Sequence, residues 1–195
     1  MTQAATHKRD EQKPRRSPLR ETLEIVITVA IVLIVSAALK LFVIDIYSVP
    51  TGSMIPTIEL NDRIFTEKIT PHFHNTKPQE IVTFQDPMDA TRILVKRVIA
   101  IGGQTVDLRN GVVYIDNVAQ DEPYTHGKPS YPLDNLAGNV GIVYPYTVPD
   151  GMIWVMGDNR TDSSDSRYFG PISENDVMAH ALGVVWPLNH FGGFN

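Results

Sequence analysis

The 195-residue sequence contains no cysteine, which excludes disulfide cross-links, thiolate metal sites and a cysteine nucleophile. A long amphipathic helical period is also missing, and so is any internal repeat. With 43% hydrophobic and 20% charged residues, the composition excludes both a disordered chain and a membrane protein with many spans. A length of 195 residues allows one ordinary globular domain with extensions.

Charge is absent from residues 25–39, and the apolar stretch from 23 to 44 contains only two charged residues, Glu24 and Lys40, near its ends. A bilayer span needs about 20 mostly apolar residues, so this stretch is long enough to be a transmembrane helix. A buried core helix would show a polar stripe, which this segment lacks. A cleaved secretory signal is the second alternative, because small residues at 36–38 follow an apolar core. The apolar residues that continue beyond them favour an uncleaved anchor.

Basic residues are concentrated before this segment. Residues 1–20 hold six Lys or Arg and two acids, whereas the other 175 residues hold eleven basic and twenty acidic residues. A basic head could bind nucleic acid, but the apolar segment that follows it favours a membrane, and no nucleic-acid partner is expected. The positive-inside rule then places the N-terminus in the cytoplasm. We predict a basic cytoplasmic head (1–21), a transmembrane anchor (22–46) and an extracytoplasmic domain (47–195).

The extracytoplasmic part resembles a mostly β protein, with short β-branched runs separated by turn residues. Asn110-Gly111 between two such runs predicts a hairpin, because this pair readily takes the positive φ angles of a type I′ turn. Residues 119–150 contain five prolines and read as an extended, loop-rich insertion. The predicted strands are 82–84, 93–101, 106–108, 112–115, 152–156 and 181–186.

Ser53 lies in the sequence Val49-Pro50-Thr51-Gly52-Ser53-Met54-Ile55-Pro56-Thr57, just after the predicted anchor. Gly52 allows a sharp backbone bend, and the flanking prolines stiffen both sides. Ser53 is thus presented on a constrained turn. A turn serine without chemistry is the alternative interpretation of this motif taken alone.

Lys96 lies on the predicted strand 93–101, and alternation along a strand puts it on the same side as Leu94 and Val98. Burial among apolar side chains disfavours the charged amine, so the pKa of Lys96 falls. A neutral amine can take a proton from a serine hydroxyl. An edge-strand lysine whose ammonium reaches solvent is the alternative.

A third motif, residues 157–170, is dense in Asp, Arg and Ser. It predicts a hydrogen-bonded loop framework with two ion pairs, Asp158 with Arg160 and Asp165 with Arg167. A solvated polar loop is the alternative.

These three motifs, in this order behind an apolar segment, resemble those of bacterial type I signal peptidases of the peptidase S26 family. The resemblance implies a mostly β catalytic core with a small β insertion, here residues 104–150, preceded by one N-terminal transmembrane helix. It implies a membrane-bound serine endopeptidase that removes signal peptides from exported preproteins after small residues, through an acyl-enzyme. It also implies the plasma membrane as the location, preproteins and the lipid bilayer as partners, and no cofactor or metal.

The resemblance assigns a role to each matching residue. Ser53 is the nucleophile and Lys96 the general base. The oxyanion hole is formed by the Ser53 N–H with the Thr51 hydroxyl, and Ser163 orients the lysine. Asn61 stands where the family often has Gly, which affects only the turn there. The framework residues are Asp158, Arg160, Asp165 and Arg167, and the expected substrate-pocket residues are Val49, Pro50, Met54, Ile58, Leu94 and Val95.

Four other interpretations compete with this one. A Ser-His-Asp triad would need one of six histidines (7, 72, 74, 126, 180, 190), none of which has a triad context. His72 and His74 could bind a metal, but no third ligand is evident from the spacing. An anchored binding domain would not need both reactive residues. A self-cleaving repressor also uses Ser and Lys, but the chain has no DNA-reading helix pair.

Overall fold

The computed structural model describes residues 18–73, 75–133 and 141–194. The chain divides into two compact units, Met1–Leu39 and Lys40–Asn195. The first unit contains most of helix α1 (Pro18–Phe42), in which Arg20 pairs with Glu24 one turn later and no residue is buried. Within the described residues, α1 is the one helix long and apolar enough to cross a membrane.

Helix α1 ends four residues before the end of the predicted anchor, 22–46. The reason is that Ile44–Ser48 forms strand β1 and pairs antiparallel with β2 (Arg63–Glu67). Lys68 reinforces this pairing, because its Nζ lies 2.9 Å from Asp45 Oδ2. The last apolar residues of the predicted anchor therefore belong to the β domain.

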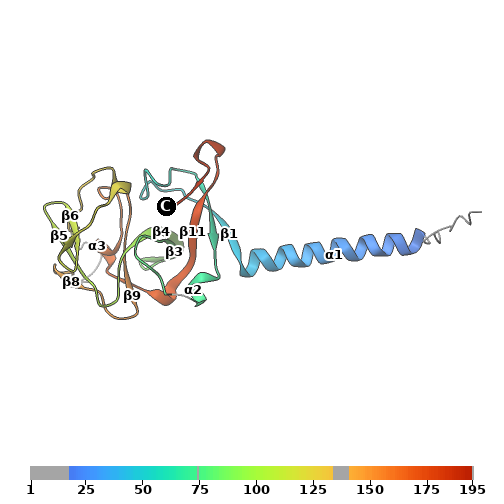
Figure 1. The fold of residues 1–195 in the computed structure, drawn as a ribbon, viewed down its shortest axis with the longest axis horizontal. Coiled ribbons are helices and arrows are strands. Elements are labelled where there is room, and N and C mark those ends of the chain that lie inside the picture. The colour runs from blue at the N-terminus through green and yellow to red at the C-terminus, as the bar shows by residue number, and fades with distance from the viewer. Residues whose placement is uncertain (1–17, 74, 134–140, 195) are drawn as a thin grey trace, which may run out of the picture. The chain divides into compact units, whose positions relative to one another are not determined.

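The main sheet has eight strands among the described residues, in the order β1-β2-β11-β3-β4-β9-β10, with β12 paired to β11. The mostly β architecture is thus confirmed. Figure 1 shows β3, β4 and β11 at the centre of this unit. The bounds of its other elements are β3 (Ile81–Asp86), β4 (Asp89–Ile101), β9 (Met152–Met156), β10 (Ile172–Ser173), β11 (Val177–Trp186), β12 (Gly192–Gly193), α2 (Thr70–Phe73), α3 (Ser166–Phe169), η2 (Glu174–Asp176) and η3 (Leu188–His190).

A second sheet of four strands, in the order β7-β6-β5-β8, lies within the segment expected to be the insertion. The predicted Asn-Gly hairpin is confirmed: Arg109 pairs with Val112, and the φ angles of Asn110 and Gly111 are 51° and 83°. The elements of this region are β5 (Thr105–Arg109), β6 (Val112–Ile115), β7 (Val118–Ala119), η1 (Pro123–Thr125) and β8 (Tyr146–Thr147).

Alternation along β4 supplies apolar side chains to separate clusters. Leu94 and Val98 pack with Val82 and Phe84 of β3, whereas Val95 points to the other face and packs in a different cluster. A third cluster joins the two sheets, because it contains residues of β4, β5, β6 and β9 around the fully buried Trp154. The apolar packing therefore fixes which side of β4 each polar residue faces.

Candidate active site

Ser53 lies on a turn between β1 and β2. The Gly52 carbonyl accepts hydrogen bonds from the Ile55 N–H at 3.2 Å and from Asn159 Nδ2 at 2.8 Å. The Ser53 carbonyl accepts the Asn159 N–H at 3.0 Å. Two carbonyls of the turn are thus tied to one residue of the loop that follows β9. On the far side of the turn, Asn61 takes the positive φ of 66° that Gly would adopt, so its replacement of Gly leaves that geometry intact.

Lys96 is buried on β4, with 2% of its surface exposed, and its Nζ lies 2.6 Å from Ser53 Oγ. It shares a face with Leu94 and Val98, as the strand period predicts. Burial lowers the pKa of Lys96 to about 8, although the charges of Asp165 and Asp86 act in the opposite direction. The amine is therefore held against the hydroxyl in an environment that favours its neutral form.

A cleft of about 900 Å³ opens over this pair of residues. Thr51, Gly52, Leu94 and Ser163 line it, together with Ser53 and Lys96. A peptide held in this cleft would thus reach the hydroxyl and the amine from the same side.

Ser163 reaches the cleft, but its Oγ is buried and makes no hydrogen bond within the described residues. The contact by which Ser163 would orient Lys96 is therefore not made in this structure. Gly157 lies directly behind, where an added Cβ would collide with the Ser53 carbonyl oxygen and with the Ser163 side chain. Because Gly157 has no side chain, the Ser53 carbonyl and the Ser163 side chain can both pack against its backbone.

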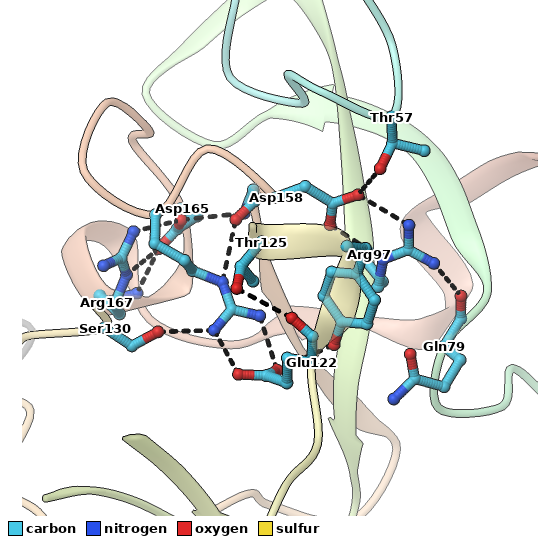
Figure 2. A network of polar contacts seen from close by, with 12 residues as sticks. Thr57, Gln79, Arg97, Glu122, Thr125, Ser130, Asp158, Asp165 and Arg167 are labelled. Carbon is cyan, nitrogen blue, oxygen red and sulfur yellow. Dashed lines mark hydrogen bonds and ion pairs between the residues drawn. The ribbon is translucent and has the colours of Figure 1, made fainter. Parts of the chain in front are cut away.

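The expected pair of Asp158 with Arg160 is wrong. Asp158 is fully buried and forms a two-pronged ion pair with Arg97, at 2.9 Å from Nε and 2.7 Å from Nη2 (Figure 2). Arg97 also donates to the Gln79 carbonyl, and Thr57 donates to Asp158 at 2.5 Å. Asp158 therefore finds its partner on β4, not two residues along its own loop.

Arg160 instead pairs with Glu122, at 2.6 and 2.7 Å, and donates to Ser130 Oγ at 2.6 Å. The second expected pair is present, since Arg167 contacts both carboxylate oxygens of Asp165 at 2.9 Å. Burial alone would raise the pKa of Asp165, but the hydrogen bonds and charge of Arg167 outweigh it and hold the pKa below its usual range. Three buried arginine–carboxylate pairs thus surround the loop.

The expected substrate-pocket residues fall into two groups. Leu94 lines the cleft and Pro50 is exposed. The other four are corrected from pocket lining to core, because the turn folds its apolar side chains inward, away from the cleft, as Val95 does from β4. These four buried residues are Val49, Met54, Ile58 and Val95.

Sequence reasoning missed four polar residues that hold the site together: Thr57, Arg97, Glu122 and Asn159. For Arg97 the strand period was a usable signal, because a charged residue on the apolar face opposite Lys96 requires a buried partner. The contacts of Glu122 and Asn159 join segments that are distant in the sequence, and no local pattern identifies them.

The histidines of the described chain lie away from the cleft lining. His190 is 3.2 Å from Asp62 and 3.5 Å from Glu59, and His180 is 3.4 Å from Glu80. No group of three or more His, Asp or Glu that could hold a metal occurs among the residues described. His7 and His74, two of the candidates considered above, lie outside the described residues.

Sequence comparison relates the chain to known proteins. Residues 22–186 match the family described as signal peptidase, peptidase S26. The chain is 33% identical to the probable signal peptidase I-1 of Synechocystis sp., over 93% of this chain and 91% of that protein. It is 30% identical to the signal peptidase I of Leptolyngbya laminosa, over 90% of this chain and 84% of that protein.

Among solved structures, a signal peptidase I from Enterococcus faecalis is 29% identical, with a TM-score of 0.42, covering 53% of this chain and 94% of that one. The match to the family extends from the apolar helix through the last long strand of the main sheet. The chain therefore belongs to the signal peptidase family, peptidase S26, and is a hydrolase of the signal peptidase I type.

Proposed function

We propose that this chain is a membrane-bound serine endopeptidase that cleaves signal peptides with Ser53 as nucleophile and Lys96 as general base. The observation that carries the proposal is the 2.6 Å distance between Lys96 Nζ and Ser53 Oγ, inside a cleft and with the lysine buried. A candidate base must lie within hydrogen-bond reach of the proton it removes and have a pKa near the working pH. With its pKa lowered to about 8, Lys96 meets both conditions.

In the first step the Ser53 hydroxyl donates its proton to the neutral Lys96 amine while Oγ attacks the carbonyl carbon of the scissile peptide. The ammonium of Lys96 then returns this proton to the departing amine, which leaves an ester on Ser53. Water, deprotonated by the same amine, hydrolyses the ester and restores both side chains. The proton balance therefore requires no second titrating residue.

The Ser53 N–H and the Thr51 hydroxyl are proposed to hold the oxyanion. Neither group donates a hydrogen bond to another described residue, and Thr51 lines the cleft beside Ser53. Both donors are thus open toward the space that the substrate carbonyl enters. Removing one such donor typically lowers turnover by about 10²–10³.

The proposed substrates are preproteins with small residues at the first and third positions before the cut, of the Ala-x-Ala kind. Apolar Leu94 and Gly52, which has no side chain, line the cleft next to the nucleophile, and Val49, Met54 and Ile58 of the turn are packed in the core. The space beside Ser53 is therefore bounded by packed side chains, which favours small substrate groups.

Helix α1 is proposed as a single membrane span in the plasma membrane, with the basic N-terminus in the cytoplasm and the β domain outside. Its length of 25 residues is sufficient to cross a bilayer, and the excess of basic residues before it agrees with this orientation. Added protease should digest the β domain in right-side-out vesicles and leave it intact in inverted ones. The reverse pattern would contradict the orientation.

Cleavage of an Ala-x-Ala preprotein by the full-length chain in detergent tests the mechanism. Ser53→Ala and Lys96→Ala should be folded and inactive, whereas Lys77→Ala, at an exposed lysine without a side-chain hydrogen bond, should cleave normally. Retained cleavage by either of the first two variants would overturn the assignment. Loss of activity in His180→Ala or His190→Ala, with Lys96→Ala still active, would instead favour a histidine base.

A further inference from the structure

The segment 122–131, which follows β7 of the second sheet, contacts the loop after β9 at several points. Glu122 and Ser130 bind Arg160, and the Tyr131 carbonyl lies 3.3 Å from Arg167 Nη1. Figure 2 shows Glu122, Thr125 and Ser130 of this segment beside the loop after β9. Lys128, from the same segment, donates to Asn159 Oδ1 at 2.6 Å.

We propose that Lys128 is a positioning residue that sets the direction of the oxyanion-hole N–H of Ser53, acting through Asn159 and the Gly52 carbonyl. The inference rests on the proposed role of Ser53 and adds two residues, neither of which touches the reacting atoms.

First, Lys128 fixes which way the Asn159 amide faces. An ammonium only donates, so it selects the Asn159 oxygen and leaves the NH₂ group on the opposite side. That NH₂ group donates to the Gly52 carbonyl at 2.8 Å. With Lys128 absent, the Gly52 carbonyl alone would hold the NH₂ end of the amide, and no described group would hold its oxygen end.

Second, the Gly52 carbonyl and the Ser53 N–H belong to one peptide group, which is trans. In a trans peptide the C=O and N–H bonds point in opposite directions. Holding the Gly52 oxygen toward Asn159 therefore aims the Ser53 N–H away from it. No other described residue accepts this N–H, so its direction depends on what holds the carbonyl.

Third, the segment that carries Lys128 is itself held firmly. The Ser130 N–H donates to the Gly111 carbonyl at 2.8 Å, at the tip of the hairpin of the second sheet. The Lys128 N–H donates to the Thr125 carbonyl at 3.2 Å, after the 3₁₀ turn η1. Preorganised donors are effective in catalysis because they need no reorientation during the reaction. The second sheet thus provides a rigid base for Lys128.

The test compares full-length Lys128→Met, Lys128→Arg and Lys77→Met in cleavage of an Ala-x-Ala preprotein. We expect Lys128→Met to lower kcat about 10-fold with KM little changed, because the Ser53 N–H stabilises the oxyanion of the transition state and not the bound substrate. Lys128→Arg keeps a cationic donor and should recover most of kcat, and Lys77→Met should match the wild type. Wild-type kcat in Lys128→Met would overturn the inference.

A double-mutant cycle with Asn159→Ala shows whether the effect passes through Asn159. If it does, Lys128→Met should cause no further loss in the Asn159→Ala background. If the losses of kcat in the two single variants multiply in the double variant, the proposed route through Asn159 is wrong. Asn159→Asp provides a check that does not depend on stability, because it keeps the Lys128 contact but cannot donate to the Gly52 carbonyl, so kcat should fall. Full kcat in folded Asn159→Asp would also overturn the inference.

Ser53→Ala, assayed beside these variants, separates the two levels of the argument. Active Ser53→Ala would refute the proposed function itself. Inactive Ser53→Ala together with fully active Lys128→Met would refute only the positioning role.

Discussion

The rate of preprotein cleavage should follow the deprotonation of Lys96. With a pKa of about 8, roughly one tenth of the amine is neutral at pH 7, against about 0.03% for a lysine at its usual pKa. Burial thus increases the concentration of competent base about 300-fold at neutral pH. We expect kcat/KM to rise about tenfold per pH unit between pH 6 and 7 and to level off above pH 8 to 9.

The assay is cleavage of an Ala-x-Ala preprotein by the full-length chain in detergent, at low substrate concentration, from pH 6 to 10. The Asp86→Asn variant supplies the perturbation. The charge of Asp86 raises the pKa of Lys96, so removing it should move the midpoint of the profile to lower pH. Asp89→Asn is the matched control, because Asp89 contacts the same Arg92 from an exposed position outside the cleft.

A midpoint near pH 10 would refute the reasoning, because it would mean that burial does not lower the pKa of the base. A profile that is flat from pH 6 to 9 would show that no group of this kind controls the rate. A shift to higher pH in Asp86→Asn would contradict the sign of the electrostatic argument. Circular dichroism across the same range checks that the profile does not reflect unfolding.

Three further predictions concern stability and packing. Lys96→Met should raise the free energy of unfolding at pH 7 by up to roughly 3 kcal/mol, and urea titrations should show this gain shrinking from pH 8 to 10.5, where wild-type Lys96 is neutral when folded and charged when unfolded. Thr57→Val, which removes a hydrogen bond to the buried Asp158, should lower the unfolding free energy by about 2 kcal/mol in the same titrations, and an unchanged midpoint would contradict this. Gly157→Ala should abolish cleavage by displacing the nucleophile turn, whereas Gly192→Ala, with open space around the added methyl group, should remain active.

The parts of the structure that follow from short-range patterns could be predicted from the sequence. The Asn110-Gly111 hairpin depends only on the positive φ angles of those two residues. The side of β4 on which Lys96 lies depends only on the period of a strand and on its apolar neighbours. Local stereochemistry determines both features, so no knowledge of distant segments was needed.

The parts that depend on distant segments could not be predicted in this way. Asp158 pairs with Arg97, 61 residues earlier in the chain, because a buried carboxylate takes the guanidinium that packing brings to it. The apolar residues of the Ser53 turn were expected in the cleft, but the turn buries Met54 and Ile58 in the core instead. The end of α1 was placed four residues too late, since hydropathy does not distinguish the last turn of a helix from the apolar strand β1.

Strand β4 presents Lys96 and Arg97 to opposite faces of the sheet, each opposite a defined residue of β3, Val82 and Ile81. A slip of β4 by one residue that brings Val95 opposite Val82 would also bring Lys96 opposite Ile81, so that the amine would face Asp158 and no base would face the serine. A slip by two residues would return Lys96 to the side of the serine but displace it along the strand. The pairing register of β3 and β4 therefore determines whether the serine has a base at all.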